Sequence, residues 1–292
     1  VALVGYGQWT DVVTRSAEGE ELYAFYGYKT DGVYTSFEDL ISSPVDMRSN
    51  SNPVVTNADG TKSWSTNPGD YNPKTTTYIG DVKFVDVNGD GIIDENDKTK
   101  IGSAMPKWTF GWNNTFRYKN LDLTIFVNGS IGNKVGNYMK MKLTHMNSPW
   151  QNQLVDCGNH ALLAPKNGQA VDNWYYDASN VIVTNPDCAY PRASINDPSD
   201  NDVWSDRFIE DGSYLRLKSI TLGYTFDKQL IKKLGLTNLR LTLNATNLLT
   251  ITGYDGYDPE IGASTASQNV YGLDNGRYPA PTSFTFGLNV SF

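Results

Sequence analysis

The chain has 292 residues, of which 39% are hydrophobic and 12% aromatic, so it is long enough to fold and is not a disordered tail. Its 24 Lys and Arg against 32 Asp and Glu give a net charge of −8, and such a chain lacks the basic surface that a nucleic-acid partner requires. Abundant Tyr, Trp, Gly and Asn favour strands and turns over helix bundles. We therefore expect an all-β protein that binds no nucleic acid.

The opening residues 1–7, VALVGYG, are strand-like, and we take them as the end of a first strand. They show no basic segment followed by a cleavage site. No later run approaches the roughly 20 apolar residues that a membrane-spanning helix needs. Membrane β-strands show only an alternation of apolar and polar residues, so the lack of a long apolar run does not exclude a β-barrel.

The stretch DVNGDGIIDEND, residues 86–97, has the spacing of a calcium-binding loop. Ile92 stands where a backbone carbonyl binds the ion, and Gly91 permits the sharp turn. Oxygen-bearing side chains fall at loop positions one, three, five, nine and twelve, which are Asp86, Asn88, Asp90, Asp94 and Asp97. Calcium suits this oxygen-rich set, whereas zinc would require Cys or His.

The same residue types also form turns that hold no ion, so an empty Asx-rich turn is the alternative. Asp97 stands where Glu is usual, and its shorter side chain makes bidentate binding less favourable. The flanking segments are strand-like and turn-like instead of the paired helices of an EF-hand. We therefore expect a structural clip that binds calcium, not a calcium switch.

Residues 108–118 and 121–131 alternate as two strands joined by a tight turn. The apolar set comprises Trp108, Phe110, Trp112, Phe116, Tyr118, Leu121, Leu123, Ile125, Val127 and Ile131. Each arm has the length of about 9 to 11 residues that a tilted membrane strand requires. We predict a membrane hairpin here.

The connection 133–211 is long and contains Cys157 and Cys188 in a sequence rich in Gly, Asn and Pro. A disulfide that closes a loop and two free thiols are both open interpretations. The same connection carries weak candidates for stacking on sugar rings, namely Trp150, Trp174, Tyr175 and Tyr176. Most loop aromatics only pack their loop in place, so the substrate-binding residues are otherwise unknown.

Alternation returns at residues 220–226 and 239–245 and runs without an error through the terminal SFTFGLNVSF, residues 283–292. Arg216 and Lys218 would share the apolar face of Ile220 if the alternation continued, so either they lie above the hydrocarbon or a β-bulge resets the register. A half-buried strand of a soluble sandwich would alternate in the same way.

Connection lengths favour a membrane barrel over a sandwich. The turns after residues 118 and 226 are short, whereas the connections 133–211 and 253–282 are long, and this asymmetry is typical of outer-membrane barrels. We predict that both long connections and the calcium-type loop are extracellular, that the C-terminus is periplasmic, and that outer-membrane lipid covers the apolar faces.

Four long segments carry a family resemblance: GDVKFVDVNGDGIIDENDKTKIGSAMPKWTFGWNNTFRYKNLDLTIFVNGSIGN, FIEDGSYLRLKSITLGYTF, LRLTLNATNLLTITGYDGYDPEIG and YPAPTSFTFGLNVSF. Together with FYGYKTDGVYTSFED at residues 25–39, they closely resemble the C-terminal part of the SusC/RagA family of TonB-dependent outer-membrane transporters of Bacteroidetes. The similar segments follow one another in the family's order from about residue 20 to the end.

The resemblance implies a barrel of about 22 strands with an N-terminal plug. It also implies import of oligosaccharides or other bulky nutrients, energy from the TonB system through the missing N-terminal part, and a SusD-like surface lipoprotein as lid. The plug and most strands are absent from residues 1–292, and our count of about six strands is below the smallest known barrels. Since open sheet edges are unstable in lipid, the remainder of the barrel or another chain must complete the sheet.

The alternative is a secreted calcium-dependent carbohydrate-binding β-domain, which would share the metal loop and the aromatics. Such a domain would not need a perfectly alternating terminal strand that ends in Phe292. An enzyme is the weakest interpretation, because the two histidines lie in no metalloprotease, nucleophile-elbow or phosphate-loop motif. We expect no catalytic residues.

Overall fold

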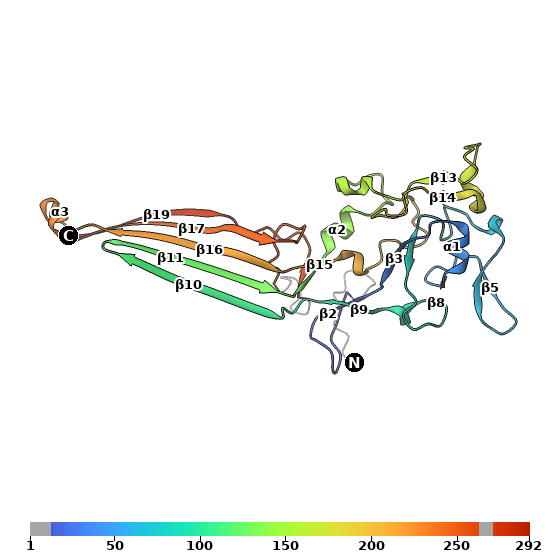
Figure 1. Cartoon of the computed structure of the whole chain (residues 1–292), viewed down its shortest axis with the longest axis horizontal. Helices are drawn as coiled ribbons and strands as arrows, with labels where there is room; N and C mark the ends of the chain where they lie inside the picture. Colours follow the sequence, from blue (N-terminus) through green and yellow to red (C-terminus); the bar gives the residue numbers. More distant parts are fainter. Residues whose placement is uncertain (1–12, 263–270) are drawn as a thin grey trace.

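The computed structural model describes residues 13–262 and 271–292. A five-stranded sheet lies at one end of the molecule, and a body of short elements lies at the other (Figure 1). The sheet, which we call the wall, has the order β10-β11-β16-β17-β19, with antiparallel neighbours throughout. Its strands are β10 (Trp108–Tyr118), β11 (Leu121–Ile131), β16 (Tyr214–Thr225), β17 (Asn238–Thr252) and β19 (Ser283–Ser291). The predicted first strand, residues 1–7, lies outside the described residues.

The two faces of the wall differ in polarity. Cross-strand partners on one face are apolar, as in the pairs of Leu243 with Phe286 and of Leu241 with Leu288. This face stays open to the surroundings, with Phe286 65% and Leu243 51% exposed. The opposite face carries polar partners such as Thr221 and Asn244. A soluble sandwich would cover its apolar face with a second sheet, so the wall has the construction of a membrane barrel.

A β-bulge interrupts the alternation of β16. Val127 pairs with Leu217, whereas the preceding Phe126 pairs with Ser219, so Lys218 has no partner in this ladder. The extra residue turns Arg216 onto the polar face, and there it is 3% exposed. Of the two alternatives that the sequence left open for these cations, the bulge is confirmed.

Short and long connections lie at opposite ends of the wall. The short ones are residues 119–120 and 226–237, and the second contains α3 (Lys228–Ile231) and the 3-10 turn η7 (Lys232–Leu234). The C-terminus lies at this end, and both long connections leave from the other (Figure 1). Within residues 13–262 and 271–292, no helix has the length and apolar character required to cross a membrane.

The body contains many short elements. Its strands, with those that link it to the wall, are β1 (Thr14–Arg15), β2 (Ala24–Gly27), β3 (Thr30–Val33), β4 (Val45–Asp46), β5 (Val54–Thr56), β6 (Lys62–Trp64), β7 (Val82–Phe84), β8 (Ile92–Ile93), β9 (Thr99–Ser103), β12 (Lys134–Asn137), β13 (Leu163–Pro165), β14 (Val181–Val183), β15 (Ile209–Asp211) and β18 (Leu273–Asp274). The helices are α1 (Phe37–Ser42) and α2 (Tyr138–Leu143), with 3-10 turns η1 (Pro68–Asp70), η2 (Glu95–Asp97), η3 (Val155–Gly158), η4 (Trp174–Tyr176), η5 (Ala178–Asn180) and η6 (Asp206–Phe208).

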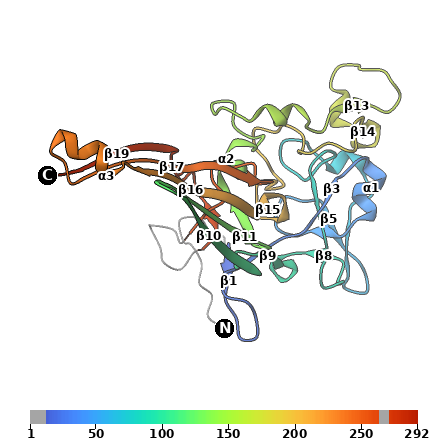
Figure 2. The same ribbon diagram turned by 60° about the vertical axis from the view of Figure 1, so that its left-hand side comes forward.

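Two distant stretches of sequence share the core of the body. Fully buried Leu40 and Ile79 pack in one cluster with Val181 from the connection between β11 and β16. Figure 2 shows the same association, with α1 and β3 beside β13 and β14. A buried ion pair joins these stretches as well, because Arg192 Nη2 donates to Asp81 Oδ2 at 3.0 Å. The body is therefore an ordered unit and not a set of loose loops.

The cysteines are not bridged. Cys157 is buried and Cys188 is half-buried, and both thiols are free. Burial raises the pKa of the Cys157 thiol, and its Sγ donates to the carbonyl oxygen of Leu143 at 3.6 Å. Of the two alternatives that the sequence left open, free thiols are therefore the one observed.

Charge substitutions on β19 should distinguish its two faces. We expect Phe286→Arg to lower the free energy of unfolding in lipid by about 2–4 kcal/mol more than Thr285→Arg, because an arginine facing hydrocarbon near the midplane loses its hydration. Thr285 is the matched control, since it adjoins Phe286 and faces the polar side. Denaturant titration of the full-length receptor refolded into vesicles measures both values. Equal losses would contradict a lipid-facing side.

Candidate functional site

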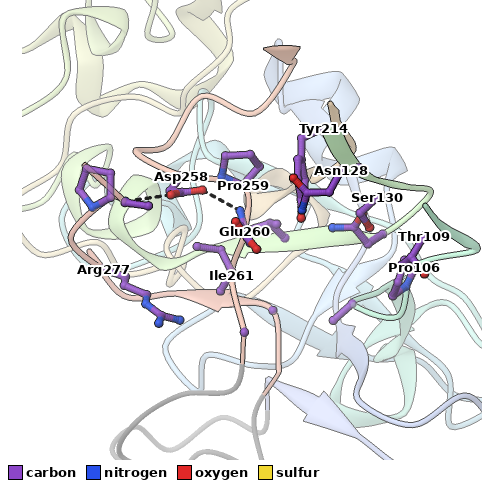
Figure 3. Close-up of a pocket in the computed structure, with 18 of the residues that line it drawn as sticks. Pro106, Thr109, Asn128, Ser130, Tyr214, Asp258, Pro259, Glu260, Ile261 and Arg277 are labelled. Atoms are coloured by element: carbon purple, nitrogen blue, oxygen red, sulfur yellow. Dashed lines mark hydrogen bonds between the residues drawn. The ribbon is translucent and has the colours of Figure 1, made fainter. Parts of the chain in front are cut away.

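A cavity of about 940 Å³ lies between the polar face of the wall and the connection that follows β17 (Figure 3). Asn128 and Tyr214 line it from β11 and β16, and Glu260, Ile261 and Arg277 line it from the connection. The polar face of a closed barrel lines the lumen. The cavity therefore opens toward the interior of the barrel, at the end where the long connections leave the wall.

Arg216 holds the connection against the wall. Its Nη1 donates to Glu260 Oε2 at 2.7 Å, and its Nη2 donates to Asp258 Oδ1 at 2.5 Å. Its Nε donates to Thr250 Oγ1 on β17 at 2.9 Å. Lys218, the bulged residue, donates to the same Glu260 oxygen at 2.9 Å. We call the group of Arg216, Asp258 and Glu260 the latch.

Asp258 connects the latch to the chain just before β19. Its Oδ2 accepts a hydrogen bond from the backbone N–H of Ala280 at 3.1 Å, and its Oδ1 accepts one from that of Glu260 at 2.9 Å. Burial opposes ionisation of this carboxyl, but the hydrogen bonds from Arg216 and from the two N–H groups outweigh it and lower the pKa of Asp258. The latch is therefore a charged and hydrogen-bonded group, as a buried ion must be.

The first half of the predicted calcium loop is a series of turns closed by its own side chains. Asp86 Oδ2 accepts from the N–H of Gly91 at 2.7 Å, and Asp90 Oδ1 accepts from that of Ile92 at 2.9 Å. Asn88 Oδ1 accepts from the N–H of Asp90 at 2.9 Å. An ionised carboxylate has about four acceptor positions, so these bonds leave lone pairs that fit a hard cation.

The second half of the loop is arranged differently. Asp97 is fully buried, and its two oxygens accept from the N–H groups of Val87 and Asp94 at 2.9 and 2.8 Å. Asp94 in turn caps η2 by accepting from Asn96 N–H at 2.7 Å. Asp97 thus ties the two ends of the loop together. Within the described ranges, no group of three or more His, Cys, Asp or Glu side chains is arranged to hold a metal ion.

The aromatic candidates separate into two places. Trp174 and Tyr175 line a mostly apolar groove of about 580 Å³ on the body, together with Tyr78. Tyr176 lies beside this groove, with its ring centroid 4.4 Å from that of Tyr175. Trp150 is 92% exposed and lines neither cavity. The structure therefore brings three of the four aromatics together.

Sequence reasoning missed the acids and the arginine of the first cavity. The segment YDPEIG belongs to a stretch that carries the family resemblance, but the resemblance assigns no contact to Asp258 or Glu260. The sequence contains one signal for these acids, which is Arg216 within a predicted strand. A cation that faces the polar side of a strand requires a carboxylate partner. The connection after β17 supplies carboxylates a few residues beyond the strand that adjoins Arg216.

Comparisons with known proteins agree with the architecture, although no family model matches the chain. It is 32% identical over 284 residues to the TonB-dependent receptor P3 of Formosa agariphila, covering 94% of this chain and 22% of that receptor. It is 27% identical over 213 residues to the TonB-dependent receptor SusC of Bacteroides thetaiotaomicron, covering 72% of this chain and 17% of SusC. The solved RagAB peptide transporter superposes with a TM-score of 0.51 and 18% identity, over 93% of this chain and 23% of that one.

The fold and the two-faced wall define a segment of an outer-membrane type of β-barrel. The chain belongs to the SusC/RagA family of TonB-dependent receptors. It spans less than a quarter of the length of the relatives described above. These relatives are receptors and transporters, which agrees with the expectation of a non-enzyme and gives no support to a secreted carbohydrate-binding domain.

The latch makes a direct prediction for Arg216→Met. Removing one partner of a buried ion pair leaves uncompensated charge, at a cost of about 3–5 kcal/mol. We therefore expect the connection to detach, and the Ala280 amide to exchange its hydrogen at least about tenfold faster in the full-length receptor. Mass spectrometry of hydrogen exchange measures this rate.

Arg240→Met is the matched control for Arg216→Met. Arg240 also pairs with a carboxylate of the wall, donating to Asp122 Oδ1 at 2.7 Å, but it lies near the short-turn end. Its replacement should leave Ala280 exchange unchanged. Unaltered exchange in Arg216→Met would show that the connection is held by other contacts.

Proposed function

We propose that the chain forms part of the wall of an outer-membrane nutrient importer. The observation that carries this proposal is the wall itself, with one apolar face and one polar face, in a chain related over 94% of its length to a TonB-dependent receptor. The remainder of the barrel closes the sheet, lipid covers the apolar face, and the TonB system supplies energy through the rest of the receptor. In this arrangement the C-terminus is periplasmic and the body is extracellular.

A SusD-like surface lipoprotein is the partner that we propose for the body. The family resemblance implies such a lid, and the body lies beyond the wall at the end with the long connections (Figure 1). Its buried core and ion pairs make it a firm platform on which a second protein can rest. Two solved structures that are similar to this chain are those of the RagAB peptide transporter and of the RagAB peptide importer.

We propose oligosaccharides or other bulky nutrients as the substrates. A cavity of about 940 Å³ at the wall and a groove of about 580 Å³ on the body have the size of sites for small oligomers. The groove is lined by the aromatic side chains of Trp174 and Tyr175, which suit contact with sugar rings or with apolar side chains. The substrate-contacting role of these aromatics is part of the proposal.

Uptake measurements test the importer function. Cells whose only receptor for a labelled oligosaccharide is the full-length protein should accumulate the label when TonB is intact and lose accumulation when TonB is deleted. Accumulation that depends on neither protein would contradict the proposal. Labelled oligopeptides, used in parallel, identify the class of substrate.

The aromatic groove is tested by truncating its rings. Trp174→Ala combined with Tyr175→Ala should weaken equilibrium binding of the imported oligomer by about thirtyfold, since each of the two stacking contacts is worth about 1 kcal/mol. Trp150→Ala is the matched control, because that residue is exposed and lines neither cavity. Equal affinity of all three proteins in calorimetry would remove the groove from the binding site.

We also propose that residues 86–97 bind calcium as a structural clip. The support is the oxygen spacing together with the free lone pairs of Asp86, Asn88 and Asp90 and the carbonyl of Ile92, whereas Asp97 closes the loop from within. Metal analysis of the purified receptor should show one calcium ion fewer after Asp86→Ala combined with Asp90→Ala. Asp59→Ala, in an exposed turn elsewhere in the body, is the control. An unchanged calcium content would show that residues 86–97 form a turn that binds no ion.

A further inference from the structure

The cavity at the wall carries more positive than negative charge. Arg216 binds both carboxylates of the cavity, those of Asp258 and Glu260. Lys218 binds the same Glu260 oxygen as Arg216. The two carboxylates are thus matched by two cations before Arg277 is considered. Arg277 and Lys134 also line the cavity, and together they are its surplus positive charge.

Arg277 is placed to meet a ligand. Its side chain is exposed at the edge of the cavity near Ile261 (Figure 3). No ion pair involving Arg277 is found within residues 13–262 and 271–292. The neighbouring sequence ASTASQNV, residues 263–270, contains no acid that could neutralise it.

The neutral groups of the cavity add a second and independent observation. Asn128 Oδ1 is buried and has no hydrogen-bond partner in the part of the chain that the structure describes. A buried acceptor without a donor is unfavourable, so this atom is suited to a hydroxyl donor from a ligand. Tyr278 lines the same cavity and is 85% exposed, which leaves its ring face free.

We propose that this cavity is a subsite for an acidic oligosaccharide. The carboxylate of a uronic acid unit binds the Arg277 guanidinium, because a charged donor and a charged acceptor form the stronger hydrogen bonds. A sugar hydroxyl donates to Asn128 Oδ1, and a sugar ring rests on Tyr278. This inference rests on the proposed importer function and adds the charge of the substrate to it.

The overall charge of the chain strengthens the argument. With 32 acidic against 24 basic residues, the net charge of −8 disfavours anionic solutes at long range. A surplus cation at a polar cavity is therefore a local exception that favours an anion. A neutral sugar can accept a hydrogen bond from Arg277 but gains no charge–charge attraction from it, so the side chain favours acidic over neutral substrates.

The test is calorimetric binding to the purified full-length receptor in detergent, with trigalacturonate as the acidic probe and galactotriose as the neutral one. Trigalacturonate should bind about tenfold more tightly at low ionic strength, and added salt should reduce this preference. Arg277→Gln should abolish the preference without changing galactotriose binding. Lys233→Gln, which removes an exposed cation at the short-turn end, is the matched control and should keep it.

Equal binding of the two sugars by the unmodified receptor, or a preference that survives Arg277→Gln, would overturn the subsite. Binding of triglutamate through Arg277 without any binding of trigalacturonate would also overturn it, in favour of acidic peptides. A receptor that shows the Arg277-dependent preference but imports no labelled oligomer would instead refute the importer function and leave the subsite standing. The two proposals therefore fail in different measurements.

Discussion

The pairing of backbone groups in hydrocarbon is the constraint on which this structure depends. Lipid offers no hydrogen bonds, so every N–H and C=O that enters it must find a partner strand. The inner strands β11, β16 and β17 have neighbours on both sides, whereas β10 and β19 each present an open edge within the wall. These edges require further strands, and the chain spans less than a quarter of the length of the relatives described above. A second property of hydrocarbon, its poor solvation of polar side chains, explains why one face of the paired strands is apolar.

The cavity arises where the wall departs from regular alternation. A regular strand would turn Arg216 toward lipid, at a cost of several kcal/mol for the buried charge. The bulge at Lys218 sends Arg216 inward, where Asp258 and Glu260 bind it. Because Asp258 and Glu260 belong to the connection after β17, their bonds to Arg216 hold this connection against the wall, where it lines the cavity. A single irregularity in one strand thus accounts for the latch and for the cavity beside it, whereas the surplus positive charge comes from other lining residues, Arg277 among them.

The sequence predicts the wall better than it predicts the site. The ranges 108–118 and 121–131 coincide with β10 and β11, because their alternation is unbroken. The ranges 220–226 and 239–245 are shorter than β16 and β17, since the bulge near Lys218 and Asn247 breaks the periodicity there. The latch joins residues about forty positions apart, and the burial of Asp97 depends on packing, so neither is visible in local spacing. The sequence predicts no fold for the body: its residues before β10 show only the calcium-type loop, and 133–211 is predicted only as a long connection. Its strands pair distant segments, as Gly136 does with Leu273, and such pairing is not visible in local sequence.

The account depends most on lipid covering the apolar face, and spin labels at two adjacent positions of β17 test this directly. Nitroxides placed at residue 243 or 244 of the full-length receptor in vesicles should differ in accessibility, because Leu243 lies on the apolar face and Asn244 on the polar one. The account predicts that the label at 243 collides with oxygen dissolved in the bilayer and is shielded from a water-soluble nickel chelate. A label at 243 that meets the nickel chelate, or that is shielded from both reagents by packed protein, would contradict it.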